Sequence, residues 1–136
     1  NTCRQNKFVI EKEIITDPIR DTLLQQITFK PTEKNTSSTF NLYALLNPHL
    51  HNKGKENTGW KGDYKGIPML FAKRDHICLA FACSVDFLKT SLGFVGTSDG
   101  YTDLKIHHQM EWEYETAEKE TLRFLHNSIF LKMKKL

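Results

Sequence analysis

Residues 69–82 run Met-Leu-Phe-Ala-Lys-Arg-Asp-His-Ile-Cys-Leu-Ala-Phe-Ala, so two apolar runs flank four polar residues. Apolar runs of this length on either side of a short polar turn are typical of a β-hairpin. The stretch therefore predicts two antiparallel strands, at residues 69–72 and 77–82, joined by a turn at residues 73–76.

Similar runs lie on both sides of this hairpin, and none of them repeats another. Residues 110–115, Met-Glu-Trp-Glu-Tyr-Glu, alternate apolar and acidic side chains most strictly. The other predicted strands are residues 8–15, 23–29 and 40–46. At least six strands before residue 118, with short connections, predict an all-β fold, an antiparallel β-sandwich.

Three stretches interrupt the strand pattern. Residues 47–66 and 93–103 are rich in glycine and are predicted to be loops, and a connection as long as the first is more often functional than not. From Leu122 to Leu136, apolar residues recur at spacings of three and four, which favours a helical tail with a basic polar side. That helix either packs on the sandwich or offers its apolar stripe to a partner or an anionic membrane surface.

The charge is concentrated at the end of the chain. Residues 119–136 hold five basic residues and one acidic residue, a net charge of +4, whereas residues 1–118 hold 14 basic and 15 acidic residues, a net charge of −1. A near-neutral body gives no support for nucleic-acid binding, which needs a positive field over a surface. The change in composition also divides the chain into a β-sandwich domain, 1–118, and a basic tail, 119–136.

Residue types that carry catalysis or bind metals form no recognisable constellation. The acidic residues of the 110–115 strand share one face, which is typical of a solvated sheet surface rather than of two carboxylates opposed across a substrate. His49 and His51 have the spacing of two metal ligands but no third ligand. We therefore assign no catalytic residue, metal or cofactor.

Three cysteines cannot all pair within the chain. Cys78 and Cys83 lie five residues apart, which places their thiols on opposite faces of a strand, so they are predicted to be unbridged small core residues. An odd number of cysteines favours a reducing, cytoplasmic location.

The remaining candidates are aromatic. Trp60, Tyr64 and Tyr101 lie in the glycine-rich segments, close to asparagine and aspartate. Aromatic faces beside planar polar groups can hold sugar rings by stacking and hydrogen bonding. The alternative is that these side chains fill the end of the sandwich or a seam between domains.

Several motifs carry a family resemblance. They are Asn-Thr-Gly-Trp at residues 57–60, Tyr-Lys-Gly-Ile-Pro-Met-Leu-Phe-Ala at 64–72, Gly-Phe-Val-Gly-Thr-Ser-Asp-Gly-Tyr at 93–101 and Trp-Glu-Tyr-Glu-Thr-Ala-Glu at 112–118. In this order, they resemble the N-terminal domain of bacterial glucoamylases and glucodextranases, which belong to glycoside hydrolase family 15. The resemblance covers about residues 7–118 and ends where the basic tail begins.

The resemblance implies an antiparallel β-sandwich of the supersandwich, galactose-mutarotase-like type, here incomplete and followed by the helical tail. It implies a catalytic (α/α)6 barrel as the partner in complete family members, and α-glucan as the substrate. Neither catalytic glutamate of that barrel has a counterpart here, so the chain alone is not predicted to be an enzyme. The family includes secreted enzymes, which favours an extracellular or periplasmic location.

Two hypotheses follow. The first is a non-catalytic accessory domain that supports the barrel or contacts glucan, with Trp60, Tyr64, Asp99 and Tyr101 as the contact residues. The second is a stand-alone interaction protein that uses the sandwich as a scaffold and the basic tail as the binding element. Strand edges left open by an incomplete sandwich would be covered by homodimerisation, by strand swapping or by the tail.

Overall fold

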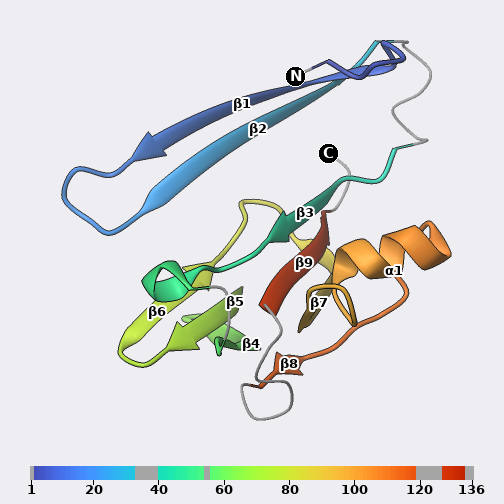
Figure 1. The fold of residues 1–136 in the computed structure, drawn as a ribbon. Helices are drawn as coiled ribbons and strands as arrows, with labels where there is room; N and C mark the ends of the chain where they lie inside the picture. Colours follow the sequence, from blue (N-terminus) through green and yellow to red (C-terminus); the bar gives the residue numbers. More distant parts are fainter. Residues whose placement is uncertain (1, 33–39, 54–55, 119–126, 134–136) are drawn as a thin grey trace. The chain divides into compact units, whose positions relative to one another are not determined.

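The computed structural model describes residues 2–32, 40–53, 56–118 and 127–133, and these form antiparallel sheets with one short α-helix (Figure 1). The chain divides into two compact units, Asn1–Phe40 and Asn41–Leu136. No helix among these residues is long and apolar enough to cross a membrane.

The first unit is a long hairpin of β1 (Phe8–Thr16) and β2 (Leu23–Pro31). Phe8 and Phe29 lie on one face of it, and Phe40 packs against both, with ring centroids 5.3–5.4 Å apart. The two strands predicted at residues 8–15 and 23–29 are therefore confirmed, and an aromatic cluster holds one end of the hairpin.

The second unit contains a four-stranded sheet in the order β6-β5-β4-β8. Its strands are β4 (Thr58–Tyr64), β5 (Ile67–Arg74), β6 (Ile77–Phe81) and β8 (Thr116–Ala117). The predicted hairpin at residues 69–82 is confirmed as β5 and β6, joined by a turn in which Asp75 has φ 53°. Because the 47–66 segment holds β4 and a short 3-10 helix, η2 (Leu50–Asn52), its prediction as a loop is wrong in part.

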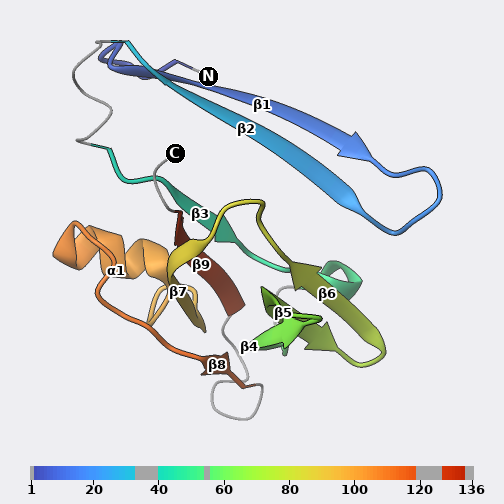
Figure 2. The ribbon, with the colours of Figure 1, turned by 180° about the vertical axis from the view of Figure 1, so that it is seen from behind.

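The other sheet of this unit has three strands in the order β3-β9-β7 (Figure 2). They are β3 (Tyr43–Leu46), β7 (Phe87–Phe94) and β9 (Asn127–Met133). The helix predicted for the tail is therefore wrong over Asn127–Met133, which form the central strand, while residues 119–126 and 134–136 lie outside the described residues. Spacings of three and four fit a helix, but a short apolar run such as Ile-Phe-Leu at 129–131 fits a central strand equally well.

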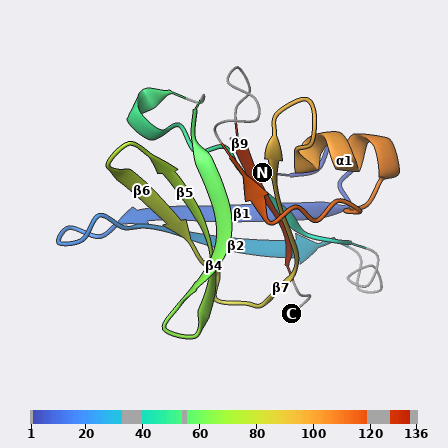
Figure 3. The same ribbon diagram turned by 90° about the horizontal axis from the view of Figure 1, so that it is seen from below.

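The two sheets share one hydrophobic core. Leu70 and Ala72 of β5 pack with Leu92 and Phe94 of β7, and Leu50 of η2 and Ala117 of β8 complete the buried cluster. Figure 3 shows β4, β5 and β6 on one side of this unit and β7 and β9 on the other, with the helix α1 (Gly100–His107) beside them. The β-sandwich prediction is confirmed, and α1 packs against β7 and β9.

Two further segments differ from prediction. Residues 87–94 form β7, which the sequence pattern did not reveal, and residues 110–115 are not a strand, although they alternate most strictly. All three cysteines are free, so the prediction that Cys78 and Cys83 are unbridged is confirmed, but Cys78 is exposed and Cys83 only partly buried, so neither is a core residue. Cys78 alternates with Ile77 and Leu79, whose side chains pack against the core, so it faces outward.

Candidate functional site

The 93–103 segment is not a loop throughout but the end of β7 followed by a turn and the start of α1. Asp99 caps the helix, since its Oδ1 accepts the backbone N–H of Thr102 at 2.7 Å. Its Oδ2 accepts the backbone N–H of Gly96 and the Thr102 hydroxyl. The side chain is nearly inaccessible, with 3% exposed, so this carboxylate serves the local backbone.

Asp99→Ala is expected to lower the free energy of unfolding by about 1–2 kcal/mol, because it removes the N-cap of α1 and leaves the N–H groups of Gly96 and Thr102 without their acceptor. Asp99→Ser keeps a capping oxygen and should retain most of that stability. Urea denaturation of the two variants and the parent chain measures the difference. Equal losses in both variants would contradict a capping role.

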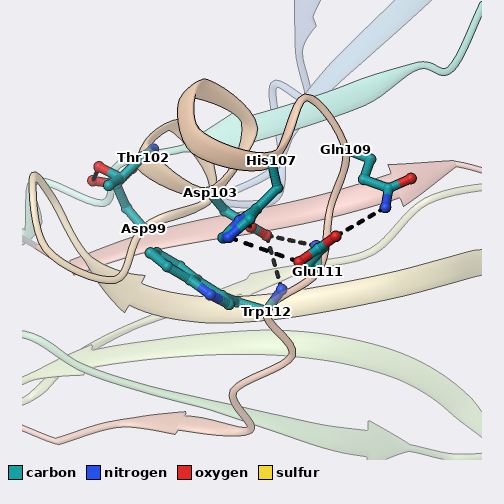
Figure 4. A network of polar contacts seen from close by, with 7 residues as sticks. All are labelled: Asp99, Thr102, Asp103, His107, Gln109, Glu111 and Trp112. Carbon is teal, nitrogen blue, oxygen red and sulfur yellow. Dashed lines mark hydrogen bonds and ion pairs between the residues drawn. The ribbon is translucent and has the colours of Figure 1, made fainter.

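Asp103 lies in the first turn of α1 and is completely buried. Its Oδ2 accepts the backbone N–H groups of both Glu111 and Trp112 at 2.9 Å (Figure 4). Its Oδ1 lies 2.8 Å from Nδ1 of His107, one turn further along the helix. One carboxylate therefore holds residues 111 and 112, which pair with no strand in the described part of the chain.

His107 lies between two carboxylates. On its other side, Nε2 is 3.7 Å from Oε2 of Glu111, whose Oε1 accepts a hydrogen bond from Nε2 of Gln109 at 2.9 Å. The Trp112 ring meets the imidazole edge to face, with centroids 5.6 Å apart. The arrangement fixes the imidazole on three sides and orders the residues that follow the helix (Figure 4).

Residues 109–115, which we call the anchored segment, connect α1 to both sheets. The Tyr114 N–H donates to Oγ of Ser91, and the Tyr114 carbonyl accepts the Leu92 N–H at 3.0 Å. The Glu115 carbonyl accepts the N–H of Lys61 on β4, also at 3.0 Å. The segment therefore ties β7 to β4 through backbone hydrogen bonds, although it forms no ladder.

An ion pair adds a further contact. Nζ of Lys89 lies 2.8 Å from Oε1 of Glu113, and this hydrogen bond raises the pKa of Lys89 above its usual value. Both side chains are about 40% exposed, so solvent weakens the attraction. Glu111 and Glu113 are thus exposed carboxylates with polar partners.

A cavity of about 300 Å³ lies beside this ion pair. Its lining includes Lys61, Leu70, Phe87, Lys89, Thr90 and Glu113. The lining combines apolar and charged groups, but it contains none of the four predicted contact residues.

The four predicted contact residues, Trp60, Tyr64, Asp99 and Tyr101, lie on two elements of the structure. Trp60 and Tyr64 belong to β4, where Trp60 stacks on Phe71 with ring centroids 5.3 Å apart and planes 13° from parallel. Tyr64 is 56% exposed at the end of the strand, and Lys65 Nζ lies 5.3 Å from its ring centroid. The Trp60–Phe71 pair occupies the outer face of the four-stranded sheet, because Gly59, Leu70 and Ala72 on the alternate positions are buried.

Asp99 and Tyr101 belong to the start of α1, and Tyr101 is 64% exposed. No hydrogen bond or ring contact within the described part of the chain joins this pair to Trp60 or Tyr64. The structure thus places the four residues in two pairs, one on each element.

The residues that organise the site, Asp103, His107 and Ser91, were not predicted from sequence to do so. Asp99, Asp103 and His107 are spaced four residues apart, which on a helix aligns them along one side. That spacing is a signal for a helix, whereas the glycines of residues 93–103 favour a loop. Among the described residues, no three His, Cys, Asp or Glu side chains are placed to hold a metal ion.

Comparison with known proteins gives consistent matches. The family model described as "Glucodextranase, domain N" matches residues 1–128. A glucoamylase from Clostridium sp. (strain G0005) is 32% identical over 117 residues, which cover 86% of this chain and 16% of that protein. A crystal structure of a bacterial glucoamylase complexed with acarbose matches 98% of this chain and 19% of its own, with a TM-score of 0.89 and 27% identity. The chain therefore spans less than a fifth of either glucoamylase.

Proposed function

Because the chain belongs to the glucodextranase domain N family and corresponds to the N-terminal β domain of glycoside hydrolase family 15 glucoamylases, we propose that it is a non-catalytic accessory domain. Its role in this proposal is to support the folding and position of a catalytic (α/α)6 barrel. One observation carries the proposal: the match covers nearly all of this chain and only a small part of each glucoamylase.

The geometry of α1 and the anchored segment supports this role. Their backbone is fixed by buried carboxylate contacts, while Tyr101, Ile106 and Tyr114 are 64%, 56% and 44% exposed. Large apolar side chains on a rigid backbone can bury area against a partner at little cost in conformational entropy. We propose that these side chains contact the barrel, with Asp99 acting indirectly by fixing the start of α1.

A chimera tests the accessory role. In the Clostridium glucoamylase, this chain would replace the segment that it matches, and a second form would lack the segment altogether. We expect the chimera to be soluble and to release glucose from maltooligosaccharides, and the shortened form to lose soluble enzyme. An equal yield and equal glucose release from both forms would contradict the proposal.

We also propose that the Trp60–Phe71 pair contacts α-glucan, since two stacked rings on an outer sheet face offer a platform for a sugar ring. Trp60→Ala is expected to weaken maltoheptaose binding by on the order of 1 kcal/mol, about fivefold in dissociation constant. Isothermal titration of the full chain measures this effect, with Tyr101→Ala on α1 as the matched aromatic control. An unchanged dissociation constant for maltoheptaose after Trp60→Ala would show that Trp60 does not contact glucan.

A further inference from the structure

The β1–β2 hairpin forms a two-stranded sheet of its own, so each strand has an outer edge. On β1, Thr2 bridges to Val9 and covers part of that edge. On β2, the pairings within the described residues involve β1 alone. Within this part of the chain, the outer edge of β2 is therefore open to a further strand.

The two edges differ in charge. β1 carries Glu11, Lys12 and Glu13 at its centre, whereas residues 23–29 of β2, Leu-Leu-Gln-Gln-Ile-Thr-Phe, carry no charge, glycine or proline. Charged side chains are a common means of keeping an edge strand from pairing with another chain. Uncharged runs rich in apolar and β-branched residues lack this protection.

One face of the hairpin is apolar along most of its length. The register places Phe29 opposite Ile10, Ile27 opposite Lys12, and Leu23 opposite Thr16 on this face. Phe40 packs on the face at one end, while towards the turn Ile14, Leu23 and Ile27 are 56%, 55% and 44% exposed. A further strand beside β2 would extend this apolar face.

We propose that β2 pairs antiparallel with β2 of a second copy of this chain, which goes beyond the accessory role proposed above. Ile27 is the midpoint of Leu23–Pro31, so pairing about it uses the whole strand. Ile27 then meets Ile27 of the second copy, and Lys30 meets Leu24, so no like charges are opposed. The apolar faces of the two hairpins lie on the same side of the resulting four-stranded sheet, because directly opposed residues point the same way.

Pairing β1 with itself in the same way is unfavourable, because it opposes like charges. Antiparallel pairing of β1 about its midpoint, Lys12, would oppose Lys12 to Lys12 and Glu11 to Glu13. Like charges directly opposite each other destabilise a strand pair. The second copy therefore pairs through β2, and the two-fold symmetry closes the assembly at a dimer.

Ile27→Glu tests this pairing in the full chain. Within one hairpin, the new carboxylate lies opposite Lys12, which favours the hairpin, whereas across the dimer it lies opposite itself. We expect the dimer dissociation constant to rise by on the order of tenfold or more, because the apolar Ile27–Ile27 contact is lost and two like charges are opposed. Sedimentation velocity over a concentration series measures it.

The matched control is Ile15→Glu, which changes a comparably exposed isoleucine on β1 in the same way. This variant should dimerise like the parent chain. A parent chain that remains monomeric throughout the series would overturn the proposal, and so would assembly beyond the dimer. An equal loss of dimer in both variants would also overturn it.

A charge swap separates lost pairing from lost folding. The double variant Lys12→Glu/Ile27→Lys keeps an opposite-charge pair within its own hairpin, but in a homodimer the two introduced lysines would lie opposite each other. We expect it to be monomeric alone and to form a heterodimer when mixed with Ile27→Glu. Failure of the mixture to associate would overturn the pairing about Ile27.

Discussion

Asp103→Ala is expected to lower the free energy of unfolding by about 3–5 kcal/mol. The substitution leaves the N–H groups of Glu111 and Trp112 without their buried acceptor and removes the partner of His107 Nδ1. A hydrogen bond to a charged group contributes about 1.5–3 kcal/mol, and both backbone hydrogen bonds to this carboxylate are lost. Since domains of this size are stable by about 5–15 kcal/mol, the change removes a large part of the total.

Chemical denaturation measures this loss, and hydrogen exchange localises it. The amide protons of Glu111 and Trp112 should exchange much faster in Asp103→Ala, while those of the β5–β6 hairpin change only through the global equilibrium. Asp103→Asn keeps one side-chain acceptor and should lose less stability. Glu113→Ala, which removes an exposed carboxylate from the same segment, should cost less than about 1 kcal/mol. A loss in Asp103→Ala no larger than in Glu113→Ala would contradict the anchoring role.

Gly93→Ala is expected to be at least as damaging, with a loss of about 3 kcal/mol or more. A Cβ atom at this position would lie 2.0 Å from the carbonyl oxygen of Ser98 and 2.6 Å from its carbonyl carbon. Both are backbone atoms, so no side-chain rotation relieves the overlap. The turn between β7 and α1 would have to move, and it carries Asp99 and the start of the helix.

Gly66→Ala is the control for this substitution. Gly66 has φ +81°, and nothing lies within 4 Å of the position of its Cβ, so the cost there is conformational and about 1 kcal/mol. Thermal and urea unfolding of both variants separate steric overlap from backbone strain. Gly93→Ala with a loss no greater than that of Gly66→Ala would show that the turn adjusts freely.

The strands predicted correctly are those whose turn and pairing partner lie next to them in the sequence. In the β5–β6 hairpin, the polar turn and the flanking apolar runs lie within fourteen residues, 69–82. The β1–β2 pair has a similar pattern. Local propensity and pairing agree in these segments, so sequence was sufficient.

Prediction failed where a side chain or a strand outside the segment determined its structure. Residues 110–115 alternate as a strand does, but Asp103 binds the N–H groups of Glu111 and Trp112. In the tail, apolar spacings of three and four are compatible with a helix, but residues Asn127–Met133 pair with β3 on one side and β7 on the other and form a strand. The anchoring role of Asp103 was beyond local patterns, since a buried acceptor for two backbone donors becomes evident only when both segments are positioned.

The position of β9 between β3 and β7 has a consequence for the order of folding. β3 ends at residue 46, and its partner begins at residue 127, so this pairing joins segments that are far apart in the sequence. During synthesis, β3 and β7 emerge before β9, so the edges that pair with β9 are exposed until it is made. Contacts of such long sequence separation slow folding, and open edges in the interval expose the nascent chain to aggregation. The three-stranded sheet is therefore the part of the molecule for which a chaperone that shields strand edges would matter most.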